Sequence, residues 1–293
     1  MTYSIVAHDP VGAEVGVAVQ SRAFGTGAAC AWALPGVGGV ATQSFTERSY
    51  GPAGLDLMKQ GRASREALDD LLADDPLREV RQVAFVDSGG GAAAHTGEQC
   101  IAHAGDLQGA EFTVQGNMLR SPDVWPAMAE RFAGAPGSLA ERLLATLDAA
   151  EEAGGDFRGR QAAGLVVVTT DRSGSPYDRV FDLRVDDHPE PLAELRRLHR
   201  LAAGYRRRNR IGPGANPDEE IAAARDAGLS DDDIATAAAF AHAHNGDLER
   251  AASALSGLVA EEPLWRTAFE RYEELGVLPA GVVARLVPDT IGS

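Results

Sequence analysis

Thr2 is the residue whose place in the chain most directly suggests chemistry. Methionine is normally removed before a small second residue, and removal of Met1 would leave Thr2 with a free α-amino group. Such an amine has a pKa of about 7.7 to 8.0 and is partly unprotonated at neutral pH. It can take the proton of its own hydroxyl, directly or through water, while Oγ1 attacks an amide carbonyl. The alternative is that Thr2 is an ordinary chain end.

A β-hairpin would hold this threonine on a rigid element. The stretches "TYSIVAH" and "EVGVAVQS" read as strands, and "DPVGA" between them supplies the Asp, Pro and Gly of a turn. If His8 faces Val15, the numbers of paired residues sum to about 23. This register predicts that Ser21 lies opposite Thr2. Ser4 lies on the same strand face as Thr2, but an internal serine has no α-amino base.

The remaining elements indicate an α+β protein. A third strand is expected over 36–44, two helices follow, and a strand pair is expected in "REVRQVAFVDSGGGAAAHTG". "EFTVQGNML" reads as a strand that runs into a Gly-Asn turn, and two more helices come next. Two strands, "QAAGLVVVTT" and "DRVFDLRVDD", are joined by the turn "DRSGSPY", and a long helix starts near Pro191. Such segregated runs favour layered, mostly antiparallel sheets.

The chain changes character after this helix. Residues 196–210 contain seven Arg and no acid, whereas residues 217–293 contain 15 acids and 5 bases and read as short helices. We therefore predict a first domain over 1–211, a Gly, Pro and Asn linker, and a small acidic helical domain over 217–293. The arginine run is expected to dock against that acidic domain or to be solvated.

Composition excludes several classes of protein. The net charge of -16 disfavours binding to nucleic acid or to an anionic membrane surface. Lys59 is the single lysine, so no P-loop is present and a Schiff-base enzyme would depend on Lys59 alone. Cys30 and Cys100 lack the spacing of a thiol-rich zinc site or a disulfide framework. With no signal peptide or apolar span in the sequence, we expect a cytoplasmic protein without a cofactor.

Eight segments of the chain resemble successive blocks of one bacterial family. They include "TYSIVAHDPVGAEVGVAVQS", "GVGGVATQSF", "YGPAGLDLM", "REVRQVAFVD", "AAHTGEQC", "VQGNML", "GRQAAGLVVV" and "LRVDDHPEPLAELRRL". In this order, over residues 1 to about 205, they are similar to the Ntn-hydrolase-like family labelled domain of unknown function 1028. The resemblance implies the four-layer αββα sandwich of N-terminal-nucleophile (Ntn) amidohydrolases. It also implies a homo-oligomer, because such sandwiches often associate.

The resemblance implies roles for several residues. The Ntn pattern asks for Thr, Ser or Cys at the mature N-terminus, which Thr2 satisfies once Met1 is cut, and it places a polar residue such as Ser21 beside it. Proteasome-like sites use a lysine at the end of the third strand, where this chain has Thr42, Gln43 and Ser44. A neutral polar site or the neighbouring Arg22 must replace that positive charge.

Three further residues are candidates for contacts with a substrate. The segment "VQGNML" offers the Asn117 amide and the N–H groups around Gly116 to a developing oxyanion. The alternative is that Gly116 and Asn117 simply form a turn. His95 ends a strand in "AAHTGE", where an ordinary hydrogen-bonded histidine is the alternative to a substrate contact.

These observations support a leading hypothesis and two rivals. The leading hypothesis is an amidohydrolase for a small amide or short peptide, with Thr2 as nucleophile. The first rival is a non-catalytic module that binds a ligand or cell-wall fragment, since the helical domain resembles peptidoglycan-binding-like segments. The second is a metal-dependent hydrolase centred on "DDH" at Asp186, Asp187 and His188. Because adjacent strand residues point to opposite faces, we expect these three to cap the following helix rather than to bind metal.

Overall fold

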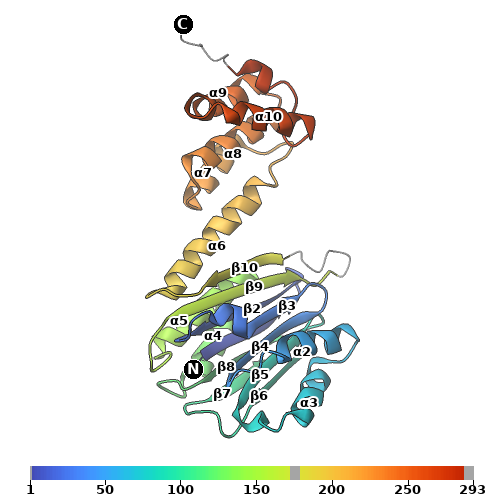
Figure 1. The fold of residues 1–293 in the computed structure, drawn as a ribbon, viewed down its shortest axis with the longest axis vertical. Coiled ribbons are helices and arrows are strands. Elements are labelled where there is room, and N and C mark those ends of the chain that lie inside the picture. Colours follow the sequence, from blue (N-terminus) through green and yellow to red (C-terminus); the bar gives the residue numbers. More distant parts are fainter. Residues whose placement is uncertain (1, 172–178, 287–293) are drawn as a thin grey trace. The chain divides into compact units, whose positions relative to one another are not determined.

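The computed structural model describes residues 2–171 and 179–286, which form two compact units, Met1–Leu198 and His199–Ser293. The "DRSGSPY" turn falls almost entirely outside the described residues. The division between the units falls inside one helix, α6 (Pro191–Arg208). Each unit is therefore described by itself, the first in the lower part of Figure 1.

Sheet A is a six-stranded antiparallel sheet that carries the N-terminal hairpin at its centre (Figure 1). Its order is β10, β9, β2, β1, β8, β7, with β1 (Thr2–Asp9), β2 (Glu14–Ser21), β7 (Gly105–Gly109), β8 (Phe112–Asn117), β9 (Ala162–Thr169) and β10 (Arg179–Val185). The predicted register of the hairpin is confirmed, because Thr2 pairs with Ser21 and His8 with Val15.

Sheet B is a four-stranded antiparallel sheet that faces sheet A. Its order is β3 (Ala31–Leu34), β4 (Gly38–Ser44), β5 (Arg81–Asp87) and β6 (Ala92–Thr96). The predicted third strand is β4. The shorter β3, which follows the one-turn helix α1 (Thr26–Cys30), was missed because four residues carry too little periodicity to signal a strand.

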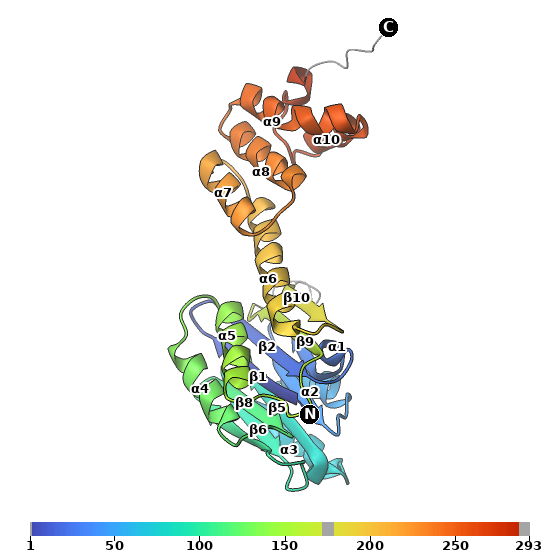
Figure 2. The ribbon, with the colours of Figure 1, turned by 90° about the vertical axis from the view of Figure 1, so that its left-hand side faces the viewer.

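Two pairs of helices cover the outer faces of the sheets. The pair on sheet A is α4 (Val124–Gly134) and α5 (Leu139–Glu152), and the pair on sheet B is α2 (Tyr50–Lys59) and α3 (Ser64–Asp74). Figure 2 shows α4 and α5 on one side of β1 and α2 on the other. The mixed α+β class with antiparallel sheets is thus confirmed.

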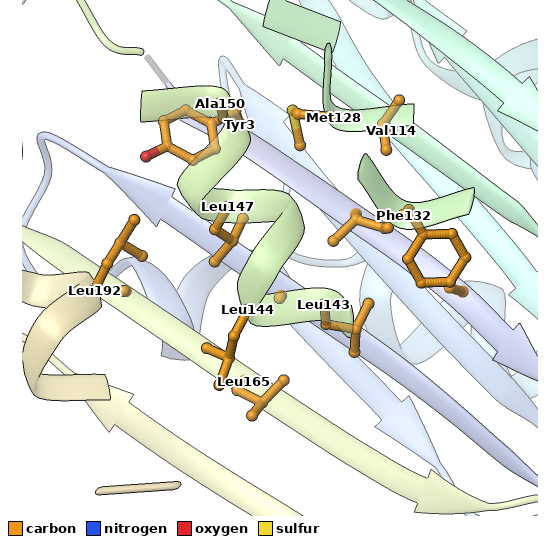
Figure 3. Packing of buried hydrophobic residues seen from close by; sticks show 14 of the residues in the cluster. Tyr3, Val114, Met128, Phe132, Leu143, Leu144, Leu147, Ala150, Leu165 and Leu192 are labelled. Carbon is orange, nitrogen blue, oxygen red and sulfur yellow. The ribbon is translucent and has the colours of Figure 1, made fainter. Parts of the chain in front are cut away.

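Separate apolar cores hold these layers together. On the outer face of sheet A, Figure 3 shows Leu143 and Leu147 of α5 close to Leu165 of β9 and Tyr3 of β1. The space between the sheets is filled largely by valine and alanine, and the outer face of sheet B packs Phe85 among the side chains of α2 and α3. The sheets therefore place one set of side chains between them and a second set under helices.

The regular elements described in the second unit, over residues 199–286, are all helical. This unit contains α7 (Pro217–Asp226), α8 (Asp231–His244), α9 (Leu248–Glu261) and α10 (Leu264–Glu274), with a short 3-10 turn at Val283–Arg285. Two arginines of the run form ion pairs with acidic side chains of the helices that follow. Arg207 makes a bidentate pair with Glu220 at 2.7 and 2.9 Å, and Arg208 pairs with Asp233. None of the helices described is both long and apolar enough to cross a membrane.

Candidate functional site

The N-terminal end of β1 lies in a polar part of the space between the sheets. Strand residues alternate between faces, so Thr2 and Ser4 share the inner face with Val6. Ser21 of β2 and Asn117 of β8 pair with Thr2 from its two sides. Polar side chains therefore gather where these three strands meet, and apolar ones fill the rest of this interface.

Thr2 and Ser21 bring their hydroxyl groups together. Thr2 Oγ1 donates a 3.1 Å hydrogen bond to Ser21 Oγ, and both residues are buried. Thr2 is joined here to Met1, which itself lies outside the described residues. The pairing of β1 with β2 is thus sufficient to place a second hydroxyl beside the candidate nucleophile.

Gln43 reaches this cluster from the facing sheet. Its Nε2 donates to the Thr2 carbonyl oxygen at 3.2 Å, and its Oε1 accepts a 2.7 Å bond from Ser4 Oγ. Ser4 Oγ accepts a further 2.6 Å bond from Gln115 Nε2 of β8. Ser4 is therefore held between two glutamine side chains and is not directed toward open solvent.

Gln82 of β5 is the centre of the network and was missed in the sequence. Its Oε1 accepts from Gln43 Nε2 at 2.7 Å and from Asn117 Nδ2 at 2.9 Å. Its Nε2 donates to Thr96 Oγ1 at 2.9 Å and to the Gly116 carbonyl at 2.8 Å. The missed signal was a polar residue within an otherwise apolar strand segment. Gln82 precedes "VAFV" in β5, and Gln115 and Asn117 lie two residues apart on one face of β8.

Gly116 and Asn117 belong to strand β8, so the predicted Gly-Asn turn is wrong. Gly116 pairs with Tyr3 on one side and Gly105 on the other, and a backbone group inside a ladder is committed to strand pairing. The N–H of Gly116 therefore does not point at a substrate. The Asn117 amide carries two N–H donors, of which the bond to Gln82 uses one.

Arg22, Ser44 and His95 lie outside the polar cluster. Arg22 is exposed, and its guanidinium donates to the Gln161 side chain. Ser44 ends β4 with a φ of 70°, and His95 Nε2 lies 2.8 Å from the Arg78 carbonyl oxygen. His95 also pairs with Val83, which packs under α2 and α3, so its side chain lies on the face of sheet B opposite to Gln82.

Two ionisable side chains near the cluster do not supply a base or a nucleophile. Burial raises the pKa of Cys30 to about 11, so its thiol stays protonated at neutral pH. Burial, together with the Glu151 carboxylate 2.5 Å from its hydroxyl, raises the pKa of Tyr3 well above its ordinary value. Tyr3 also points to the outer face of sheet A, away from Thr2.

The residues of the "DDH" segment are used in structural contacts. Asp187 Oδ1 accepts from Gln161 Nε2 at 2.8 Å, and His188 Nδ1 accepts from the Glu190 backbone N–H at 3.0 Å, just before α6 begins. Within residues 2–171 and 179–286, no group of three or more His, Cys, Asp or Glu side chains is placed to hold a metal ion.

The chain has a structural relative of known structure. The chain is similar to the crystal structure of protein SPO2555 from Silicibacter pomeroyi, which is assigned to the DUF1028 family. The two are 30% identical with a TM-score of 0.65, and the match covers 72% of this chain and 94% of that one. No curated protein matches the chain. The DUF1028 family model does not include the helical unit. It matches residues 2–195, which are most of the chain, and the chain therefore belongs to this family of unknown function.

Proposed function

We propose that this protein is an amidohydrolase of the N-terminal-nucleophile type, acting on a small amide or short peptide. The observation that carries the proposal is the position of Thr2, which begins the central strand of sheet A with its hydroxyl 3.1 Å from that of Ser21. The order of helices, two facing sheets and helices supports an Ntn-hydrolase sandwich. That fold presents the first residue of the mature chain as the nucleophile.

In the proposed reaction, the α-amino group exposed by Met1 removal accepts the Thr2 hydroxyl proton as Oγ1 attacks the amide carbonyl carbon. The tetrahedral intermediate collapses when its C–N bond breaks, and the amine leaves with the proton from the α-ammonium group. An ester on Thr2 Oγ1 remains. Water adds to this ester with the α-amine again as base, which releases a carboxylic acid and restores the threonine.

The surrounding polar groups have supporting roles in this scheme. Ser21 orients the Thr2 hydroxyl, and the Gln43 amide fixes the Thr2 backbone through its carbonyl oxygen. The second N–H of Asn117 Nδ2 is the donor we assign to the oxyanion. A neutral site of this kind does without the lysine of proteasome-like enzymes, and the α-amine remains the base.

The intact mass of the protein purified from its own host tests the central requirement. The mass must lack Met1, because a retained methionine would remove the proposed base. A library of amides and short peptides should then yield a substrate for the processed protein, and the Thr2→Val variant should not hydrolyse it. Undiminished hydrolysis by this variant would place the nucleophile elsewhere. We further propose that the protein is cytoplasmic and that it forms a homo-oligomer. Light scattering of the purified chain would test the oligomeric state.

One observation favours a second candidate, a non-catalytic binding protein on the same scaffold. The amides of Gln43 and Asn117 already bond to Gln82, as expected for a structural polar core. Binding of a glycan or peptide fragment by the full chain, equal in wild type and Thr2→Val and without turnover in either, would favour this candidate.

A further inference from the structure

The exposed phenylalanine side chains of the chain are confined to one end of the first unit. Phe24, Phe45 and Phe157 are 75%, 55% and 44% exposed, and Ile101 is 44% exposed. Single exposed apolar residues are common and need no explanation. These four all lie in segments between strands and helices of the first unit, and we call Phe24, Phe45, Ile101 and Phe157 the apolar rim.

Two members of the apolar rim follow directly from strands that carry the candidate site. Phe45 comes two residues after Gln43, and its carbonyl oxygen accepts a 2.6 Å bond from Arg81. Phe24 comes three residues after Ser21, in a turn closed by the bond from Thr26 Oγ1 to the Ala23 carbonyl at 2.7 Å. Both loops leave the sheets at the end where Thr2 begins.

The other two members are tied to the same end by hydrogen bonds. Phe157 follows Asp156, whose carboxylate accepts the Arg22 backbone N–H at 3.0 Å, one residue after Ser21. Ile101 accepts the Met118 backbone N–H at 2.7 Å, one residue after Asn117. The apolar rim therefore comes from four separate loops, and each loop is anchored beside a residue that pairs with Thr2 or contacts it.

We infer that the substrate carries a large apolar group, of leucine or phenylalanine size, beside its scissile amide. This inference rests on the proposed amidohydrolase function. A molecule that brings a carbonyl group to Thr2 from solvent must lie among the loops that surround this strand end. Covering the apolar rim removes its side chains from water, which favours an apolar ligand over a polar one. The loops are hydrogen-bonded in place, so binding does not require the rim to be assembled first.

Binding to the Thr2→Val variant tests the ligand class without relying on turnover. The probes are acetyl-Ala-Phe-Ala-amide and acetyl-Ala-Ser-Ala-amide, titrated separately by calorimetry into the full-length variant. We expect the phenylalanine peptide to bind at least about tenfold more tightly, the discrimination that one apolar group in a hydrophobic site provides. Adding Phe24→Ala, Phe45→Ala or Phe157→Ala should each reduce that preference severalfold.

Val11→Ala is the matched control, because Val11 is 95% exposed but lies in the β1–β2 turn at the opposite end of the hairpin. Its peptide preference should stay unchanged. Equal affinity for the two peptides would overturn the inference, as would rim variants that change the oligomeric state in light scattering without changing the preference. Apolar preference without hydrolysis by the wild-type protein would instead contradict the proposed function and leave the ligand class supported.

Discussion

Gln82 of sheet B donates a 2.8 Å hydrogen bond to the carbonyl oxygen of Gly116 in sheet A. The same side chain accepts bonds from Gln43 and Asn117, so one glutamine ties the two sheets together where Thr2 begins. A buried polar network of this kind stabilises a fold only while each of its members is satisfied. Gln82 therefore affects both the stability of the first unit and the geometry of the proposed site.

Replacing this residue by Gln82→Ala should destabilise the first unit by about 2 to 4 kcal/mol. The change leaves the amides of Gln43 and Asn117 buried without their acceptor, and an unsatisfied buried group costs about 1 to 3 kcal/mol. The loss of stability is measured by urea unfolding, with tryptophan fluorescence as the signal. A Trp265→Phe background leaves only Trp32 and Trp125, which both belong to the first unit. The exposed Gln60→Ala control should change stability by less than about 0.5 kcal/mol. Equal effects from both variants would show that the network contributes nothing.

Ser21→Ala should lower kcat for the substrate by roughly tenfold and leave KM nearly unchanged. The serine hydroxyl holds Thr2 Oγ1 in place, and loss of an orienting contact acts on the reacting geometry more than on binding. Ser138→Ala is the control, since Ser138 caps α5 through the backbone N–H of Glu141. It should cost about 1 kcal/mol of stability and leave kcat intact. A Ser21 variant with wild-type kcat would remove Ser21 from the mechanism.

The Asp75 carboxylate should make stability depend on pH in the acid range. Burial tends to raise the pKa of Asp75, but hydrogen bonds from Arg81, the Leu77 backbone and Tyr50 outweigh it and hold the pKa below its ordinary value. The stabilisation is therefore complete well above the unfolded-state pKa of about 3.9 and is lost as the pH falls through the folded-state value.

Asp75→Asn should accordingly destabilise the protein by about 2 kcal/mol at pH 7 and by progressively less toward pH 3. Urea midpoints across this range measure the difference. The neighbouring Asp74→Asn variant is an exposed control for the loss of one negative charge and should show a small difference at each pH. A difference for Asp75→Asn that stayed constant with pH would assign the effect to shape instead of charge.

Close packing of α1 against β9 should make Gly164 intolerant of a side chain. A Cβ there would lie 2.6 Å from the backbone Cα of Gly27, and backbone atoms cannot move aside as a flexible side chain can. We expect Gly164→Ala to cost about 2 to 3 kcal/mol in urea unfolding. At Gly134, in the last turn of α4, an added Cβ meets nothing within 4 Å, so Gly134→Ala should be neutral or slightly stabilising. Similar losses for both variants would contradict the steric explanation.

The N-terminal hairpin shows what can be predicted from sequence in this protein. Its strands are consecutive and joined by a short turn, so aligning His8 with Val15 was enough to place Ser21 opposite Thr2. The family could be identified in the same way, because its blocks are local and occur in order along the chain. In both cases the prediction depends on short segments of sequence and on their order along the chain, and it does not require knowing which distant segments pack together.

The rest of the site was decided by tertiary structure. The pair Gly116 and Asn117 has the local preference of a turn, but pairing with β1 and β7 overrides that preference and makes it part of a strand. Gln82 meets Gln43 and Asn117 across 39 and 35 positions of sequence. Local pattern assigns each of these residues to a strand face, but only the packing of one sheet on the other determines which polar side chains meet.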